Sequence, residues 1–104
     1  MSNTKRFGPG DVRDNPGQHE FELRVGDERA YLVYRRDGDV IELVHTQVPT
    51  SLEGHGIASA LAHAALDYAA DNQLKVIPTC PFVRAYLRRH ATRATIINTV
   101  PHLR

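Results

Sequence analysis

In the first half of the chain, apolar residues stand at alternate positions along residues 19–25 and 29–36, and a third apolar stretch covers residues 40–48. A period of two is typical of β-strands with one buried face. The apolar positions of the first two stretches are Phe21, Leu23 and Val25, then Ala30, Leu32 and Tyr34. The third stretch begins with a nearly continuous apolar run, which favours a central strand. Short turns, with Asp37-Gly38 as the clearest hairpin signal, join the three into an antiparallel meander.

The second half of the chain contains the period expected of helices. An amphipathic helix is predicted over residues 56–72. Its apolar face holds Ile57, Leu61, Ala65 and Tyr68. Residues 74–78 predict a short strand that pairs in parallel with the third strand, because a helix connects the two. A second helix is expected over residues 81–89 and opens with a proline. This order of elements predicts an α/β fold whose helices cover a mixed sheet.

The two ends of the chain have weaker patterns. Residues 1–17 are polar and are interrupted by glycine and proline, so we expect a flexible N-terminal extension whose last part can join the first strand. Residues 91–104 contain the apolar patch Thr95-Ile-Ile97. Either a last strand or a terminal coil fits this patch. We therefore assign residues 18–104 to a single domain.

The composition is that of an ordinary globular domain. The 104 residues are 41% hydrophobic and 24% charged, with a net charge of +1 when histidine is neutral. This balance gives no sign of a nucleic-acid partner, which a strongly basic surface would indicate. The sequence shows neither a membrane-spanning run nor a signal peptide. Cys80 is the single cysteine, which excludes an intramolecular disulfide and favours a cytosolic location without a membrane partner.

The segment between the third strand and the first helix is the clearest candidate for a binding site. Gly54 and Gly56 flank His55 where the helix begins. Glycines let the backbone approach a ligand closely, and a helix start leaves N–H groups without partners beside a partial positive charge. Such a turn suits a phosphate or pyrophosphate, although the same glycines also suit a tight connection alone. The turn lacks the Lys-Ser or Lys-Thr of a P-loop and the third glycine of the dinucleotide fingerprint.

Three separated motifs then carry a family resemblance. They are His-Thr-Gln-Val-Pro at residues 45–49, Gly-His-Gly-Ile-Ala at 54–58 and Ile-Pro-Thr-Cys-Pro-Phe-Val at 77–83. Together they resemble the GNAT superfamily of acetyl-coenzyme A-dependent N-acetyltransferases, and more narrowly a short branch that keeps only the central and C-terminal parts of the fold. The resemblance extends over about residues 12–90. It implies a truncated GNAT-like fold, acetyl-coenzyme A (acetyl-CoA) or coenzyme A (CoA) as cofactor, and an amine as acceptor.

The resemblance also implies how the cofactor is held. Backbone N–H groups of the turn would bind the pyrophosphate, and the residues that supply them are Gly54, His55, Gly56, Ile57, Ala58 and Ser59. Thr46 and Val48 would offer strand-edge backbone groups to the pantetheine amides. The turn in this family begins with Gln or Arg, whereas Glu53 stands in that place here. Its carboxylate would repel the diphosphate, so we expect the Glu53 side chain to point away from it. Arg84 and Arg88 in the second helix are candidates to bind the 3'-phosphate, or they form a solvated face.

Four side chains are candidates for the chemistry, which requires a deprotonated amine and a proton for the leaving thiolate. Many GNAT enzymes use a tyrosine of the second helix as the acid, and Tyr86 stands in that position. His45 is the first candidate for the base and Glu42 the second; a regular strand puts His45 on the face of Leu43. Cys80, just before the second helix, is a candidate nucleophile or a cofactor contact. A packing role is the alternative for Tyr86, His45 and Cys80.

The leading hypothesis is an acetyl-CoA-dependent N-acetyltransferase. A CoA-binding module without turnover is the alternative, because residues 1–17 are too few to replace the N-terminal helices that help to build the acceptor site in full-size members. A nucleic-acid or partner-binding domain with a basic helix is a third reading. The histidines lack the spacing of metal ligands, and His63 and Asp67 are expected to form a surface pair on one helix face. The sequence identifies neither the acceptor nor the oligomeric state.

Overall fold

Residues 6–97 are described by the computed structural model, and they form a six-stranded sheet with two α-helices. In chain order the elements are the short 3-10 helix η1 (Pro9–Asp11), strands β1 (Arg13–Asn15), β2 (Glu20–Val25), β3 (Glu28–Asp37) and β4 (Val40–Gln47), the 3-10 helix η2 (Thr50–Leu52), helix α1 (Ile57–Asp71), strand β5 (Lys75–Pro78), helix α2 (Pro81–Arg89) and strand β6 (Thr95–Ile96). The last part of the C-terminal tail, residues 98–104, lies outside the described residues.

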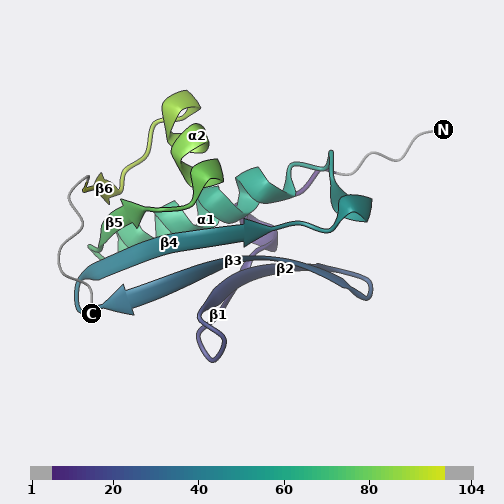
Figure 1. The fold of residues 1–104 in the computed structure, drawn as a ribbon, viewed down its shortest axis with the longest axis horizontal. Helices are drawn as coiled ribbons and strands as arrows, with labels where there is room; N and C mark the ends of the chain where they lie inside the picture. The colour runs from purple at the N-terminus through teal and green to yellow at the C-terminus, as the bar shows by residue number, and fades with distance from the viewer. Residues whose placement is uncertain (1–5, 98–104) are drawn as a thin grey trace.

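The strands lie side by side in the order in which they occur in the chain. β1 to β4 pair antiparallel, whereas β5 is parallel to β4 and β6 is parallel to β5. Two successive right-handed crossovers in the same direction put both helices on one side of the sheet, as Figure 1 shows. The predicted mixed α/β fold is confirmed. The predicted meander corresponds to β2, β3 and β4, and the strand predicted to follow the first helix in parallel corresponds to β5. The final stretch, for which strand and coil both fit, contains the short strand β6.

Residues 9–15 pack against the rest of the domain, and the last part of the expected extension joins the first predicted strand, β2, as β1. η1 contacts α1, and β1 adds an edge strand beside β2. Two large apolar side chains in or next to this segment, Phe7 and Val12, pack against the core. Two apolar side chains give no periodicity from which an element can be predicted, so long-range contacts rather than local pattern order this segment.

The core lies between the sheet and α1. Alternate residues of β2 and β3 face it as predicted, and Phe21, Leu23, Ala30, Leu32 and Tyr34 are each no more than 4% exposed. From α1 come larger apolar side chains and the fully buried alanines Ala62, Ala65 and Ala69. Small residues let a helix approach a sheet closely, and this packing fixes where the N-terminus of α1 lies. Within residues 6–97, neither helix is long and apolar enough to cross a membrane.

The opposite side of the sheet carries charged side chains in the described chain, and Glu22 is the most buried of them at 8% exposed. Its carboxylate accepts hydrogen bonds from Asn15, Arg24 and Arg29 at 3.1–3.3 Å. Burial on its own raises the pKa of Glu22, but the hydrogen bonds from these three side chains outweigh that effect. The net result is a pKa below the ordinary value of 4.5.

The lowered pKa of Glu22 determines how this residue makes the stability of the fold depend on pH. Because the folded-state pKa is lowered, Glu22 contributes stability above the unfolded-state pKa and loses it as the pH falls through the folded-state pKa. We expect Glu22→Gln to lower the free energy of unfolding at pH 7 and the difference from wild type to shrink below about pH 4. Urea unfolding across this pH range measures it. Asp27→Asn, in an exposed turn, is the control, and a wild-type to Glu22→Gln difference that does not change with pH would contradict the assignment.

Candidate functional site

β4 carries one extra residue, Val44, relative to β3. Such a bulge reverses the facing of every side chain that follows it. His45 pairs with Val33 and so faces the open side of the sheet, whereas Thr46 pairs with the buried Leu32 and faces the helices. The residues of β4 that follow Val44 therefore face the opposite side of the sheet from the side that they would face in a regular strand.

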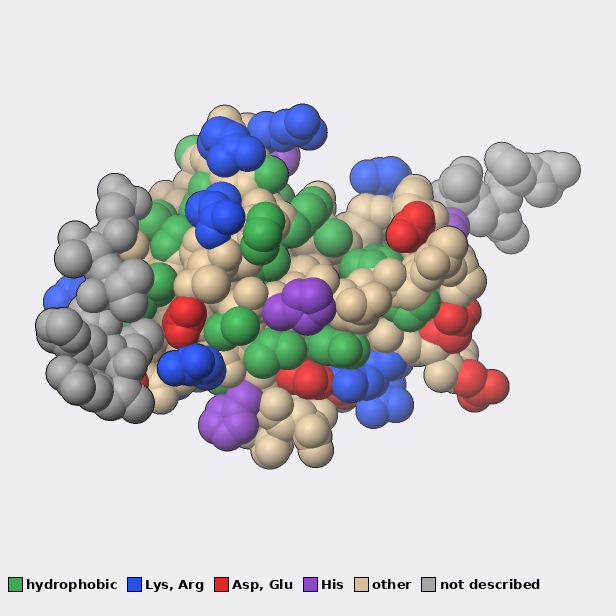
Figure 2. All heavy atoms as spheres, viewed as in Figure 1, with side chains coloured by type: hydrophobic (Ala, Val, Ile, Leu, Met, Phe, Trp, Pro, Cys, Tyr) green, Lys and Arg blue, Asp and Glu red, His purple; other side chains and the backbone are tan. Residues whose placement is uncertain are grey.

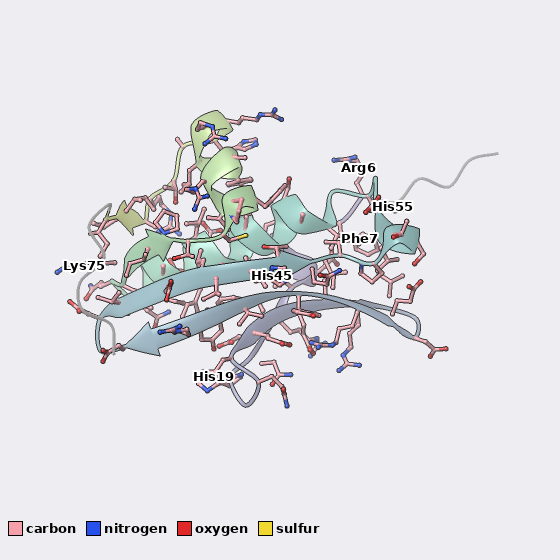
Figure 3. The ribbon with its side chains drawn as sticks, viewed as in Figure 1. Arg6, Phe7, His19, His45, His55 and Lys75 are labelled. Carbon is pink, nitrogen blue, oxygen red and sulfur yellow. The ribbon has the colours of Figure 1, made fainter. Side chains whose placement is uncertain are left out.

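The bulge corrects one prediction. His45 does not share a face with the buried residues of β4, as a regular strand would require, but is exposed on the same face as Glu42. Its Nε2 lies 3.3 Å from Gln47 Oε1. The carboxylate of Glu42 lies 3.6 Å from Arg35 Nε and accepts a hydrogen bond from the Thr79 hydroxyl. Both candidate bases thus lie on the open side of the sheet, where Figure 3 shows His45 on β4.

The sheet opens beyond the last residue pair of β4 and β5, which is Leu43 with Pro78. Proline has no N–H to continue the ladder, and the Cys80 N–H instead donates to the Leu43 carbonyl at 2.8 Å. Past this point, the side of β4 that faces away from β3 has no strand partner in the described chain. The Cys80 side chain is only 2% exposed, and its Sγ lies 3.3 Å from Thr46 Oγ1.

The glycine turn leaves the first amides of α1 free. Gly54 and Gly56 have left-handed backbones, with φ of +87° and +76°, which glycine adopts without strain. No side chain caps the helix, and its first hydrogen bond runs from the Ala60 N–H to the Gly56 carbonyl at 3.0 Å. Within the described range, three N–H groups ahead of it have no acceptor, those of Ile57, Ala58 and Ser59. This is the arrangement that the sequence predicts for anion binding.

A groove of about 260 Å³ passes along this turn. It is lined by Val48, Leu52, Glu53, Gly54, Gly56, Ile57, Ala58, Ser59 and Phe82. A hollow of about 90 Å³ lies between α1 and α2, lined by Ser59, Phe82, Ala85, Tyr86, Arg89 and His90. Because Ser59 and Phe82 line both, the groove and the hollow are neighbours. Most of the predicted cofactor residues line the groove, whereas His55 turns its carbonyl toward the Phe7 N–H at 3.0 Å.

The arginines of α2 point to two different sides of the helix. Arg84 and Arg88 line a separate depression of about 410 Å³, and Arg84 donates to the carbonyls of Pro78 and Thr79. Neither lines the groove, although both are predicted to bind the cofactor. Arg89 does line its hollow. Helical spacing in the sequence identifies Arg89 as a candidate, because it follows Tyr86 by three residues and so lies on the same helix face. Figure 2 shows Lys and Arg side chains over α2, with others at separate places on the same face.

Tyr86 lies between the two helices. Its ring stacks on His90, with centroids 4.3 Å apart and planes at 27°. Burial, together with the negative charge of Asp67, raises the pKa of Tyr86 above its ordinary value of 10.0. The hydroxyl is therefore protonated at neutral pH, which is the state that a proton donor requires.

The polar residues farther along α1 pair with one another. His63 Nε2 lies 3.3 Å from an oxygen of Asp67, which confirms the predicted surface pair. Arg93 joins this cluster, with its Nη2 at 3.6 Å from Asp67 and 3.1 Å from Asp71. The cluster is a set of exposed ion pairs on the helix surface.

Comparison with known proteins places this geometry in a family. Residues 20–96 match the family model described as GCN5-related N-acetyl-transferase. The mouse protein NATD1 is 35% identical over 86 residues, which is 80% of this chain and 78% of that protein. The chicken NATD1 is 34% identical over 85 residues, covering 79% of this chain and 77% of that protein.

The fold has a solved counterpart as well. An NMR solution structure from Staphylococcus aureus, described as GCN5-like, matches 98% of this chain and 96% of that chain with a TM-score of 0.64. Their sequences are 24% identical, so this likeness concerns the fold alone. The match over residues 20–96 and the NATD1 relatives decide the family. This chain belongs to the GCN5-related N-acetyltransferase family.

Proposed function

We propose that this protein is an N-acetyltransferase that takes an acetyl group from acetyl-CoA and transfers it to an amine. The observation that supports this most is the row of amides at Ile57, Ala58 and Ser59, which have no acceptor in the described chain and line the groove. They stand at the positive end of a 15-residue helix. Free N–H groups and a helix dipole together favour an anion such as a diphosphate.

The surroundings of the groove fit the rest of the cofactor. Val48 lines the groove just past the end of β4, and Thr46 lies on the helix side of β4. Beyond Leu43, the strand edge is unpaired in residues 6–97, so its backbone groups can pair with the pantetheine amides as an added strand would. When bound, the cofactor supplies a thioester, an activated form of the acetyl group.

The side chains around the sheet opening divide the acid and base roles between them. Tyr86, which is kept protonated, would give a proton to the leaving sulfur. His45 or Glu42 would take a proton from the amine, and the acceptor would therefore approach from the open side of the sheet. Cys80 is closed off at 2% exposure, so direct attack by the amine is favoured over an acetyl-cysteine relay. Cys80 then serves as a packing or cofactor contact beside Thr46.

A second function is favoured by one observation. No helix in the described chain covers the open side of the sheet, where the acceptor would bind. A CoA-binding module that does not transfer the acetyl group would have the same groove. Binding and turnover measured on one sample separate the two functions.

Ser59→Glu tests the anion site. At the third position of α1, a carboxylate interacts favourably with the helix dipole but repels a diphosphate. We expect CoA affinity to fall about tenfold or more while the melting temperature is kept or rises. Isothermal titration with acetyl-CoA, CoA and adenosine measures this, with Ser59→Gln as the uncharged control. A wild-type protein that binds neither acetyl-CoA nor CoA, or a Glu variant that binds as well as the Gln variant, would refute the site.

Neighbouring arginines of α2 test the position of the 3'-phosphate. Arg89 lines the hollow and Arg88 does not. If the 3'-phosphate lies in this hollow, Arg89→Ala should weaken CoA binding about three- to tenfold and dephospho-CoA binding much less, because only CoA carries the 3'-phosphate. Tyr86 lines the same hollow, so this result would count against Tyr86 as the residue that protonates the sulfur at the other end of the cofactor. Arg88→Ala is the matched control and should affect neither ligand. If Arg88→Ala selectively weakens CoA and Arg89→Ala does not, Arg88 is the residue that binds the 3'-phosphate.

Measurements of turnover test whether Tyr86 is the proton donor and whether the amine attacks acetyl-CoA directly. With a panel of primary amines and detection of the released CoA thiol, we expect Tyr86→Phe to lower kcat about 100-fold with little change in KM. In wild type, any fall in kcat from loss of the Tyr86 proton should occur at a higher pH than for a tyrosine with the ordinary pKa of 10.0, because the pKa of Tyr86 is raised. Cys80→Ala should keep most of its activity. Loss of activity in Cys80→Ala, with an acetylated Cys80 in wild type, would instead establish the relay.

A further inference from the structure

The N-terminal arm, residues 6–12, reaches the glycine turn and is anchored there. The Phe7 N–H donates to the His55 carbonyl at 3.0 Å. The two rings meet edge to face, with centroids 6.5 Å apart and planes at 72°, and Phe7 packs against the core. Figure 3 shows Arg6, Phe7 and His55 together near the beginning of α1. Arg6 therefore precedes an anchored residue, and its side chain starts beside the turn.

The Arg6 guanidinium lies directly against Gly56. A Cβ at position 56 would stand 2.9 Å from Arg6 Nη2 and 3.4 Å from its Cζ, so the guanidinium would have to move from its present position to make room for a side chain. At Gly54, by contrast, a Cβ would meet no atom within 4 Å. The absence of a side chain at position 56 thus lets the guanidinium reach the backbone where α1 begins, beside the groove that Gly56 lines.

This position is unfavourable for a cation unless an anion is present. The N-terminus of a helix carries a partial positive charge, which repels a guanidinium and attracts anions. In the part of the chain that the structure describes, no carboxylate forms an ion pair with Arg6. Glu53 lines the groove as an exposed residue, and its charge opposes a bound diphosphate. An anion in the groove would accept hydrogen bonds from the free amides and would also be attracted by the guanidinium.

We propose that Arg6 is a phosphate-binding residue of this groove, held over Gly56 by the Phe7 anchor to bind the diphosphate of CoA. The inference rests on the proposed CoA site and adds a residue to it that comes from outside the strand–turn–helix unit. The positive charge of Arg6 offsets the negative charge of Glu53 at the same turn. The arm thus completes an anion site whose own turn supplies amides and one carboxylate.

The test compares ligands with and without phosphate. We expect Arg6→Ala to weaken CoA about five- to tenfold and to leave pantetheine, which lacks phosphate, within about twofold of wild type. Arg6→Lys keeps the charge and should retain most of the CoA affinity. Arg13→Ala removes an exposed arginine from β1 of the same N-terminal region and is the matched control. Affinities come from isothermal titration at low salt, because salt screens exposed charges.

Two more variants test the anchor and the charge balance. Phe7→Ala leaves Arg6 in the chain but releases the arm, so it should lose CoA affinity by a similar factor and keep pantetheine binding. Glu53→Gln in the Arg6→Ala background removes the opposing charge and should restore part of the lost affinity. A full-length melting curve for each variant establishes that the domain is folded.

The outcomes test the role of Arg6 separately from the proposed function. If wild type binds CoA and Arg6→Ala binds it equally well, the role of Arg6 is refuted and the proposed function stands. If Arg6→Ala weakens CoA and pantetheine by the same factor, the effect is not on phosphate and the inference also fails. If wild type binds no CoA, the proposed function fails and the role of Arg6 fails with it.

Discussion

The end of the ladder between β4 and β5 is the constraint on which the site depends. The two strands pair only from Val40 to Leu43, and the proline at the end of β5 has no N–H with which to continue. Because the Cys80 N–H takes the last carbonyl of the ladder, α2 begins immediately beside the opening. The rest of β4 keeps an unpaired edge in the described chain, and the glycine turn follows at the end of that edge.

The helix that follows the turn gives the opening its electrostatic character. α1 packs its alanine-rich face tightly against the sheet, so its N-terminus is held in one place relative to β4. Its first amides have no acceptor in residues 6–97, and the left-handed glycines keep side chains away from them. The arginines nearest the site come from different parts of the chain, Arg6 from the N-terminal arm and Arg89 from α2. A fixed set of donors of this kind suits an anion better than a mobile loop does, because little ordering is required on binding.

The bulge at Val44 separates two sets of side chains across the sheet. Thr46 is turned to the helix side, where the groove lies, and His45 is turned to the open side beside Glu42. One inserted residue therefore divides the cofactor-side contacts from the candidate bases. This division fits a transfer reaction in which donor and acceptor reach the opening from opposite sides.

The sequence alone determined what depends on local periodicity and on local backbone chemistry. Alternation along 19–48 and the helical spacing after Gly56 give the strands, the helices and the parallel crossover, since these patterns reflect which residues are buried. The glycines likewise mark the turn and the start of the helix, whereas the structure decided that no side chain caps that start.

Only the tertiary structure decided the positions that depend on register and on distant contacts. The facing of His45 depends on a bulge that exists only relative to β3, so the strand's own alternation cannot reveal it. Arg89 rather than Arg84 or Arg88 lines the hollow, because the orientation of α2 against α1 selects one side of the helix. Arg6 reaches Gly56 through the contact of Phe7 with His55, residues far apart in the chain. Such contacts form when the whole domain packs, and no short stretch of sequence carries them.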